Sequence, residues 1–437
     1  MFEGICRLNP WWTEKDGLEK DEDFLKWREA KIRWEPLLLS ELPLEPFSLN
    51  FVFGPRQVGK TTLLKLLVRK LLSKGIEPER IFYFKCEKLA DYKELDEVLK
   101  AYFEFRKSRG ISSSYILLDE ITFPTEWFRT VKYYIDVGEF KGDVVIVTGS
   151  LSMYLKKEVE LFPGRRGHGK DLVMLPLSFR EYVKVLCPEI ELPRLEGLGK
   201  TEIFEKSYSS LPHLGKIEEL FEKYVKTGGF PLPVREGGIT DSIRETYWNW
   251  IRVDLAKIGR SEETFRRVAK AILEKAPSSL SLNSIAKEFE IGTHKTAFEY
   301  LDIMEKLYIV KVLYHLDPNR LLASFRKNRK IHFMDPLFFD LFSDVCLSKI
   351  PEESVVLESV VASHLARRFE AFYWKNWREI DIIAKRKEEL AGFEVKSREG
   401  ADYSKMRIGK IGNVFCLGEE LDRERNLLSL PLFLSLL

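Results

Sequence analysis

The most constraining feature of this sequence is a glycine-rich segment that lies between an apolar stretch and a leucine-rich one. Residues 48–53 read SLNFVF, a short run typical of a buried strand, and the leucines that follow residue 62 recur at helical spacing. The segment between them, GPRQVGKTT, has glycine, lysine and threonine at the spacing of a phosphate-binding loop. A strand, loop and helix in this order favour an α/β fold in which further parallel strands lie beside the first.

The loop predicts a binding site for a nucleoside triphosphate. Its residues are Gly54, Pro55, Arg56, Gln57, Val58, Gly59, Lys60, Thr61 and Thr62. Glycine lets the main chain curl so that its N–H groups and the N-terminus of the following helix face phosphate oxygens. Lys60 would bridge the β- and γ-phosphates, and Thr61 would bind Mg²⁺.

A phosphate loop requires an acidic partner strand, and residues 112–121, SSSYILLDEI, supply one. Asp119 would complete the magnesium shell, and Glu120 would orient or deprotonate the attacking water. Residues 80–87 are expected as a further interior strand. Continuously apolar strands that alternate with helices predict a parallel sheet covered on both faces.

A third strand, residues 143–150, ends in Thr148 and Ser150, which could sense the γ-phosphate or simply cap the strand. Downstream, Arg165 and Arg166 lie in the glycine-rich segment LFPGRRGHGK. Such an arginine could neutralise charge on the γ-phosphate of its own or a neighbouring subunit's nucleotide. A solvated basic loop explains the same residues equally well.

Composition favours a cytoplasmic protein without a membrane partner. The 70 basic and 68 acidic residues nearly cancel, so any surface for nucleic acid must be local. The five cysteines lie far apart, which favours neither disulfides nor a zinc site. The start lacks an apolar signal core, and the apolar residues 427–437 are too short to cross a bilayer. The single glutamine, Gln57, in a chain rich in lysine and glutamate is typical of heat-adapted proteins.

Residues 256–345 predict three amphipathic helices followed by two strands, the order of a winged helix-turn-helix. His294 and Lys295 would open its recognition helix, and the basic run from Arg320 to Lys330 would form a wing that touches DNA phosphates. The third helix has few basic residues on its outer turns, so a packing module that binds no DNA is equally compatible.

Residues 346–437 predict a helix and then strands in the core order of a restriction-endonuclease-like domain. Glu358 from the helix and Asp381 and Glu394 from the strands would bind one or two Mg²⁺ or Mn²⁺ ions, with Lys396 beside the nucleophile. The alternative is a fold retained for docking, in which the carboxylates serve only in surface ion pairs.

Taken in order, these motifs resemble a family of prokaryotic AAA-type ATPases that carry a winged helix and a PD-(D/E)xK-like domain. The segments that carry the resemblance are NPWW (9–12), GPRQVGKTT (54–62), LLDEI (117–121), VTGS (147–150), GRR (164–166), LPLSFREY (175–182) and TGGFPLPV (227–234). The resemblance implies ATP and Mg²⁺, and it implies ATPase roles for Gly59, Lys60, Thr61, Asp119 and Glu120. The residues do not indicate whether the nucleotide base is adenine or guanine. Trp11, Trp12 and Trp34 are candidates for a side chain that stacks on this base.

The expected organisation is an N-terminal segment (1–46), an ATPase core (47–176), a helical lid over the nucleotide (177–255), a winged helix (256–345) and a nuclease-like domain (346–437). Two functions follow from it. The first is a Mg²⁺-dependent ATPase that acts on or near nucleic acid, with nucleotide state controlling the C-terminal modules. The second is a nucleotide-gated switch or scaffold for a protein partner or a homo-oligomer, with an inactive nuclease-like fold.

Overall fold

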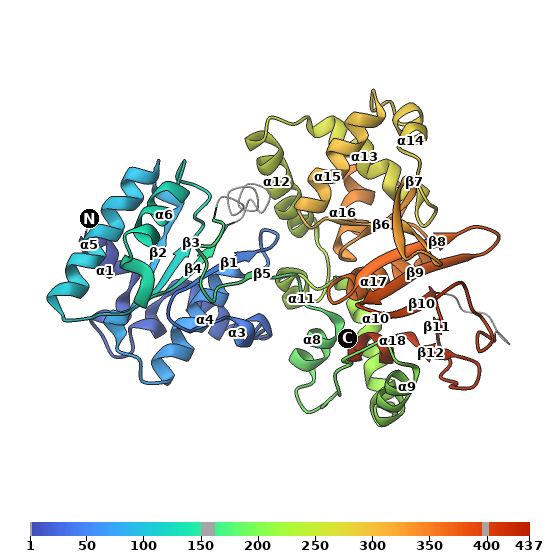
Figure 1. The fold of residues 1–437 in the computed structure, drawn as a ribbon, viewed down its shortest axis with the longest axis horizontal. Coiled ribbons are helices and arrows are strands. Elements are labelled where there is room, and N and C mark those ends of the chain that lie inside the picture. The colour runs from blue at the N-terminus through green and yellow to red at the C-terminus, as the bar shows by residue number, and fades with distance from the viewer. Residues whose placement is uncertain (1, 150–161, 396–401) are drawn as a thin grey trace. The chain divides into compact units, whose positions relative to one another are not determined.

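The computed structural model describes residues 2–149, 162–395 and 402–437. The chain divides into two compact units, Met1–Leu175 and Pro176–Leu437, called here the N-terminal unit and the C-terminal unit. Both combine helices with a sheet (Figure 1). Among the described residues, none of the helices has the length and apolar character needed to span a bilayer.

The N-terminal unit is built on a five-stranded parallel sheet with the order β2-β3-β4-β1-β5. Its strands are β1 (Ser48–Phe53), β2 (Ile81–Lys85), β3 (Tyr115–Asp119), β4 (Val144–Thr148) and β5 (Asp171–Val173). Every residue of β1 and β4 is buried, as the continuous apolar runs predict. The parallel α/β sheet expected from the sequence is therefore confirmed.

Helices surround this sheet (Figure 1). They are α1 (Phe2–Leu8), α2 (Glu22–Arg28), α3 (Leu38–Glu41), α4 (Lys60–Ser73), α5 (Tyr92–Ser108) and α6 (Phe128–Asp136). Carboxylate caps fix two of their starts. Asp21 accepts hydrogen bonds from two main-chain N–H groups of α2, and Asp91 does the same for α5.

The strand expected in the sheet interior, β2, lies at its edge. Its outer side is covered by the N-terminal segment, where the Asn9 amide accepts a hydrogen bond from Tyr83 N (2.7 Å) and donates one to Tyr83 O (2.9 Å). Asn9 thereby replaces the neighbouring strand that Tyr83 lacks. The sequence of β2 is as apolar as that of an interior strand because helices and this segment bury it. Among the described residues, no strand lies on its outer side.

The C-terminal unit begins with helices. They are α8 (Phe179–Leu186), α9 (Lys200–Ser209), α10 (Leu214–Thr227), α11 (Pro231–Glu236) and α12 (Asp241–Lys257). Ser178 and Glu181 form a capping box at the start of α8. Helices α8, α9 and α10 pack on the last helix of the chain, α18 (Leu430–Leu436). The helical character predicted for residues 177–255 is confirmed, whereas a lid over the nucleotide stays a prediction.

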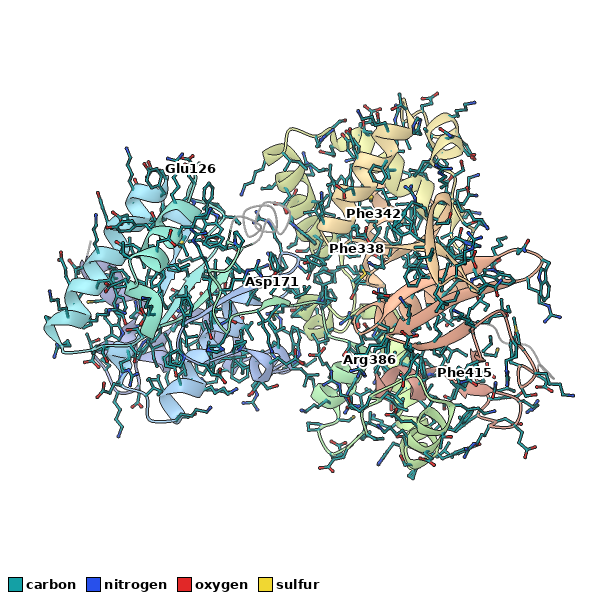
Figure 2. The ribbon with its side chains drawn as sticks, viewed as in Figure 1. Glu126, Asp171, Phe338, Phe342, Arg386 and Phe415 are labelled. Atoms are coloured by element: carbon teal, nitrogen blue, oxygen red, sulfur yellow. The ribbon has the colours of Figure 1, made fainter. Side chains whose placement is uncertain are left out.

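Three helices and a hairpin follow in the predicted order. They are α13 (Glu262–Lys275), α14 (Leu282–Glu288), α15 (His294–Lys306), β6 (Val310–Asp317) and β7 (Leu322–Phe333). Two details differ from expectation. Most of the run expected as an exposed wing belongs to β7, and a further helix, α16 (Leu337–Val345), ends the region that was expected to end in strands. The labelled Phe338 and Phe342 lie one turn apart on α16, with stacked rings 6.0 Å apart (Figure 2).

The hairpin β6–β7 does not stand apart from the nuclease-like segment. It forms one seven-stranded sheet, with the order β12-β11-β10-β9-β8-β6-β7. The other strands are β8 (Glu370–Lys375), β9 (Glu379–Arg386), β10 (Glu389–Val395), β11 (Asn413–Gly418) and β12 (Leu427–Ser429). A domain boundary at residues 345 and 346 would separate two parts of this continuous sheet.

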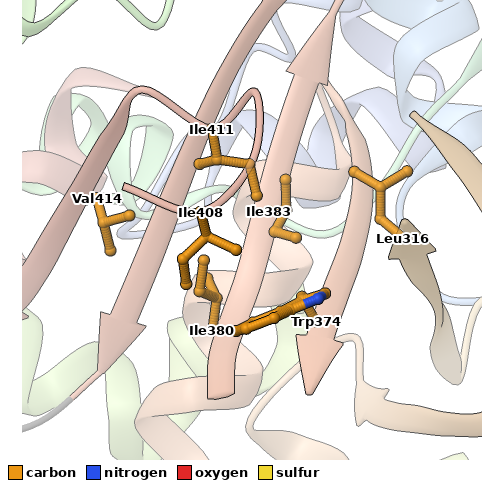
Figure 3. Close-up of a cluster of buried hydrophobic side chains, with 7 residues drawn as sticks. All are labelled: Leu316, Trp374, Ile380, Ile383, Ile408, Ile411 and Val414. Carbon is orange, nitrogen blue, oxygen red and sulfur yellow. The ribbon is translucent and has the colours of Figure 1, made fainter. Parts of the chain in front are cut away.

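Helix α17 and an apolar cluster both contact strands of this sheet. Helix α17 (Glu353–Ala366) contacts β6, β7, β8, β9 and β10. An apolar cluster on the sheet joins Trp374, Ile380 and Ile383 to Ile408, Ile411 and Val414 from the segment before and within β11, as Figure 3 shows. The cluster therefore holds β8, β9 and β11 together, and β9 also carries Asp381.

Candidate functional site

The phosphate loop connects β1 to α4 through an unusual main-chain path. Gly54 has φ 148° and Gly59 has φ 99°, values that side-chain-bearing residues rarely adopt. A Cβ atom on Gly54 would lie 2.2 Å from Met174 O, so the close approach of the residue that follows β5 also requires glycine there. The Lys60 ammonium group lies inside the loop and donates hydrogen bonds to Gly54 O (3.0 Å) and Pro55 O (2.7 Å). The loop residues predicted from the sequence therefore form one cradle.

Asp119, at the end of β3, lies beside the first turn of α4. Its carboxylate accepts hydrogen bonds from the hydroxyls of Thr61 (2.7 Å) and Tyr83 (3.0 Å) at Oδ2 and from the Thr148 hydroxyl at Oδ1. Asp119 is fully buried. The structure thus brings together the two residues, Thr61 and Asp119, that the sequence predicts as magnesium ligands.

Burial raises the pKa of Asp119 above its ordinary value, although the hydrogen bond from Thr148 opposes the shift. The charge of Glu120 also raises that pKa, and the hydrogen bonds from Thr61 and Tyr83 oppose it. A divalent cation beside this carboxylate would lower the pKa of Asp119, as the three hydrogen bonds do, since nearby positive charge stabilises the ionised form.

Glu120 and Thr148 lie together at the carboxyl ends of the neighbouring strands β3 and β4. The main-chain N–H of Glu120 donates to the Thr148 hydroxyl (3.1 Å), and Glu120 adopts a positive φ of 56°. A left-handed conformation in a residue other than glycine is uncommon and turns the chain sharply after the strand. Ser150, the second polar residue expected here, lies outside the described residues.

A buried lysine lies against the ring of Tyr83. The Lys65 ammonium group lies 3.4 Å from the centre of the Tyr83 ring and forms an ion pair with Asp21 (2.8 Å). Burial lowers the pKa of Lys65, and the charge of Asp21 raises it, although the net direction is down. Lys65, Tyr83 and Asp21 are not among the site residues predicted from the sequence. The one available signal was a lysine four residues after Thr61, on the apolar side of a leucine-rich helix.

The arginines expected at the γ-phosphate lie elsewhere. Arg166 O accepts a hydrogen bond from Leu49 N (3.0 Å), near the start of β1, whereas the phosphate loop follows the end of that strand. The four-residue rise from Leu49 to Phe53 corresponds to about 13 Å. Arg165 forms an exposed ion pair with Asp136 (2.8 Å). Arg165 therefore does not lie at the phosphate loop of its own chain, and an action on a neighbouring subunit stays a prediction.

The three tryptophans considered for base stacking have structural partners. Trp11 and Trp12 both donate hydrogen bonds to Ile81 O, at 3.0 and 2.9 Å, and the Trp12 ring stacks on Phe105. Trp34 is buried and accepts a hydrogen bond from Trp27 through its carbonyl oxygen. Trp11 and Trp12 cover the edge of β2, and the stacking of any of these three tryptophans on a base stays a prediction.

A second group of charged side chains lies on the sheet of the C-terminal unit and is called here the Lys330 cluster. The Lys330 ammonium group contacts carboxylate oxygens of Glu379 (2.8 Å), Glu358 (2.9 Å) and Asp381 (3.0 Å). Lys330 comes from β7, Glu358 from α17, and the other two from β9. The structure therefore brings together two predicted metal ligands around a lysine that was expected in an exposed wing.

A β-bulge aims Asp381 into this cluster. Phe372 pairs with Ile383 and Trp374 pairs with Ile380, so two residues of β9 lie opposite one residue of β8. A bulge of this kind redirects a side chain relative to its neighbours on the strand. The second Asp381 oxygen accepts a hydrogen bond from Val395 N (3.1 Å) at the end of β10.

The charges in the cluster perturb one another. Burial and the nearby charge of Asp381 raise the pKa of Glu358 to about 7. The pKa of Lys330 is raised, because the attraction of Asp381, Glu358 and Glu379 outweighs the effect of burial. Burial alone would raise the pKa of Glu379, but the charge of Lys330 outweighs this effect, so the pKa of Glu379 is lowered. Lys330 therefore stays protonated in the folded protein.

The other predicted members of this site contribute less. Glu394 is buried and accepts a hydrogen bond from the Tyr403 hydroxyl (2.9 Å), and Lys396 lies outside the described residues. Within residues 2–149, 162–395 and 402–437, no group of three or more His, Cys, Asp or Glu side chains is arranged to hold a metal ion. Because an ammonium group occupies the centre of the carboxylates, this arrangement does not fit the expected Mg²⁺ or Mn²⁺.

Comparison with protein families is consistent with the geometry of the N-terminal unit. Residues 47–183 match the model of an AAA domain, and residues 218–339 match that of a domain of unknown function, DUF8612. No curated protein matches. Residues 47–183 are therefore similar to AAA domains, and the phosphate loop described above lies within this segment.

Solved structures offer remote similarities. A Walker-type ATPase of Pyrococcus abyssi is 14% identical with a TM-score of 0.38, covering 75% of this chain and 97% of that one. The ORC2 protein of Aeropyrum pernix, in ADPNP and ADP complexes, is 12% identical with a TM-score of 0.39, covering 70% and 89%. The Cdc6p of Pyrobaculum aerophilum is 12% identical with a TM-score of 0.27, covering 79% and 94%.

Proposed function

We propose that the N-terminal unit binds ATP with Mg²⁺ and hydrolyses it. The observation that carries the proposal is the 2.7 Å hydrogen bond between the Thr61 hydroxyl and the buried Asp119 carboxylate, directly after the phosphate loop. A hydroxyl and a carboxylate are the two protein ligands that hold Mg²⁺ in P-loop enzymes. Their hard oxygen atoms also suit this ion.

Each residue of the site has a distinct task in this proposal. When bound, Mg²⁺ would neutralise charge on the phosphates. The ammonium group of Lys60 would exchange its contacts with Gly54 O and Pro55 O for phosphate oxygens, which are stronger acceptors because they are charged. Glu120, held at the turn after β3 by Thr148, would orient the attacking water and accept its proton.

The test is ATP turnover in two variants and their matched controls. Lys60→Ala and Glu120→Gln should each abolish turnover, and Glu120→Gln should still bind ATP. The controls are Lys74→Ala and Glu77→Gln, which change exposed residues after the opposite end of α4 and should hydrolyse ATP at the wild-type rate. Undiminished turnover in both site variants would refute the assignment.

For the C-terminal unit we propose contact with nucleic acid through α15 and the hairpin β6–β7. His294 and Lys295 are exposed at the start of α15, and Arg326 and Lys327 are exposed on β7 beside Phe325, which is 67% exposed. Basic groups beside an exposed aromatic ring suit phosphates and bases together. We expect Arg326→Ala to weaken DNA binding and to reduce its salt slope by about 1. The matched control is Lys349→Ala, at an exposed site after α16.

The second candidate, a nucleotide-gated switch for a protein partner, is favoured by the Lys330 cluster, because carboxylates paired with a lysine offer no site for a catalytic metal. The salt titration separates the two functions. A steep loss of affinity with salt indicates phosphate contacts, whereas the absence of DNA binding at low salt favours the switch.

A further inference from the structure

The Lys330 cluster is a closed ion-pair group in the interior of the C-terminal unit. The side chain of Lys330 is 1% exposed, and those of Glu358 and Asp381 are 6% and 8% exposed. Three carboxylates from α17 and β9 contact one ammonium group that comes from β7, at the far edge of the sheet. A buried charge is retained only where partners compensate it, and here each partner compensates the others.

The distances describe ammonium binding and leave no room for a second cation. The Lys330 nitrogen lies 2.8 to 3.0 Å from three oxygens that belong to three different carboxylates. Ammonium–carboxylate hydrogen bonds have this length, whereas Mg²⁺ binds oxygen at about 2.0–2.1 Å. A divalent ion between the same oxygens would stand against the ammonium charge at very short range.

Two of the carboxylates also have further protein partners. Glu379 pairs with Lys375 (2.7 Å) as well as with Lys330, and the second oxygen of Asp381 accepts the hydrogen bond from Val395 N. His332, two residues after Lys330 on β7, places Nε2 3.9 Å from Glu358 and Nδ1 3.2 Å from the Ser359 hydroxyl. Lys330 and His332, both near the C-terminal end of β7, thereby contact α17.

We propose that Lys330 is the resident cation of this site: it replaces a divalent metal ion, joins β7 to α17 and β9, and leaves the nuclease-like sheet without metal-dependent cleavage. The carboxylates of Glu358, Glu379 and Asp381 then form a latent divalent site that accepts an ion only when the ammonium group is removed. The proposal is independent of ATP turnover in the N-terminal unit.

The experiment compares the full-length wild type with Lys330→Met, which removes the charge and keeps an unbranched apolar stem. Both carry Asp119→Asn and are studied without nucleotide, so that the predicted Mg²⁺ site beside the phosphate loop does not contribute. Mn²⁺ and Ca²⁺ binding is measured by calorimetry, and thermal unfolding is followed with and without each ion. Lys349→Met serves as the control, because this lysine is exposed in the same unit.

We expect the wild type and Lys349→Met to bind neither ion in the C-terminal unit and to unfold at the same temperature with or without it. Lys330→Met should unfold at a lower temperature, regain part of the loss in Mn²⁺ or Ca²⁺, and bind the ion at least tenfold more tightly than the wild type. Adding Asp381→Asn to Lys330→Met should remove that gain.

Two results would overturn the proposal. One is Mn²⁺ binding, or Mn²⁺-dependent DNA cleavage, by the wild type that disappears in Asp381→Asn. The other is a folded Lys330→Met variant that neither loses stability nor gains affinity for either ion. If Lys330→Met does not fold, the wild type and its Asp381→Asn variant still decide the question, since only a metal site loses affinity when that carboxylate is removed. Lys330→Arg should behave as the wild type, because it retains the charge.

Discussion

Tyr83 connects the edge strand of the N-terminal sheet to the residue expected to bind Mg²⁺. Its hydroxyl donates to Asp119, and its ring lies over the Lys65 ammonium group. We expect Tyr83→Phe to reduce Mg²⁺ affinity or turnover about tenfold while ATP binding persists, because groups that orient a metal ligand contribute on this scale. Turnover as a function of Mg²⁺ concentration measures the effect. Tyr133→Phe, at an exposed tyrosine of α6, is the control, and an unchanged Mg²⁺ dependence in Tyr83→Phe would contradict the positioning role.

His364 is a second residue whose chemistry the fold determines. Phe179 N donates to its Nε2 (2.9 Å), and Nδ1 lies 2.7 Å from Val360 O, so the neutral ring donates through Nδ1 and accepts through Nε2. Burial lowers its pKa to about 3, and the charge of Arg367 acts in the same direction. A proton on Nε2 would remove the acceptor that satisfies the first N–H group of α8.

The sign of the resulting pH dependence follows from this lowered pKa. The unfolded chain takes up a proton near pH 6.5 and the folded chain does not until about pH 3, so the stabilisation is complete above pH 6.5 and is lost as the pH falls. The free energy of unfolding should fall by about 1.4 kcal/mol per pH unit from this residue. Urea titrations between pH 6.5 and 4.5 should show a shallower slope for His364→Leu than for the wild type or for His294→Leu, at an exposed site. Equal slopes would exclude His364 as the source.

At the scale of elements, the N-terminal segment acts as the missing neighbour of β2. The side chain of Asn9 is fully buried and satisfies both Tyr83 N and Tyr83 O. Asn9→Ala would leave these two main-chain groups unpaired, at about 1–3 kcal/mol each. We therefore expect the free energy of unfolding of the N-terminal unit to fall by about 2–6 kcal/mol. Thr13→Ala, at an exposed site in the same segment, should change it by less than about 0.5 kcal/mol. A similar small effect for Asn9→Ala would contradict the edge-covering role.

Elements with a strong local pattern were predictable, and their partners were not. The loop between β1 and α4 could be predicted because its glycines, lysine and threonine lie within nine consecutive residues. The acidic end of β3 could be predicted because its apolar run stops at Asp119. The edge position of β2 depends on Asn9, more than seventy residues away, which no period in the sequence reveals. The burial of Lys330 is equally hidden, since it ends a basic run typical of a solvated surface.

At the scale of the molecule, the division into two units predicts how a nucleotide changes stability. The phosphate loop, Asp119 and their supporting residues all lie in Met1–Leu175, whereas the seven-stranded sheet lies in Pro176–Leu437. A ligand stabilises only the cooperative unit that binds it, by about 2.7 kcal/mol at a hundred times its dissociation constant. We therefore expect calorimetry to resolve two unfolding transitions, of which one moves to higher temperature with a non-hydrolysable ATP analogue and Mg²⁺.

Variants assign the two transitions to their units. Lys60→Ala should abolish the shift and Lys74→Ala should retain it, because only the first residue lies in the loop. Lys330→Met should lower the transition that the nucleotide does not move, because it leaves three buried or half-buried carboxylates without their shared cation. If calorimetry shows one transition that the nucleotide analogue raises and Lys330→Met lowers, the two units unfold as a single cooperative block. The nucleotide-gated alternative would then gain support, since binding at the loop would act directly on the stability of the C-terminal sheet.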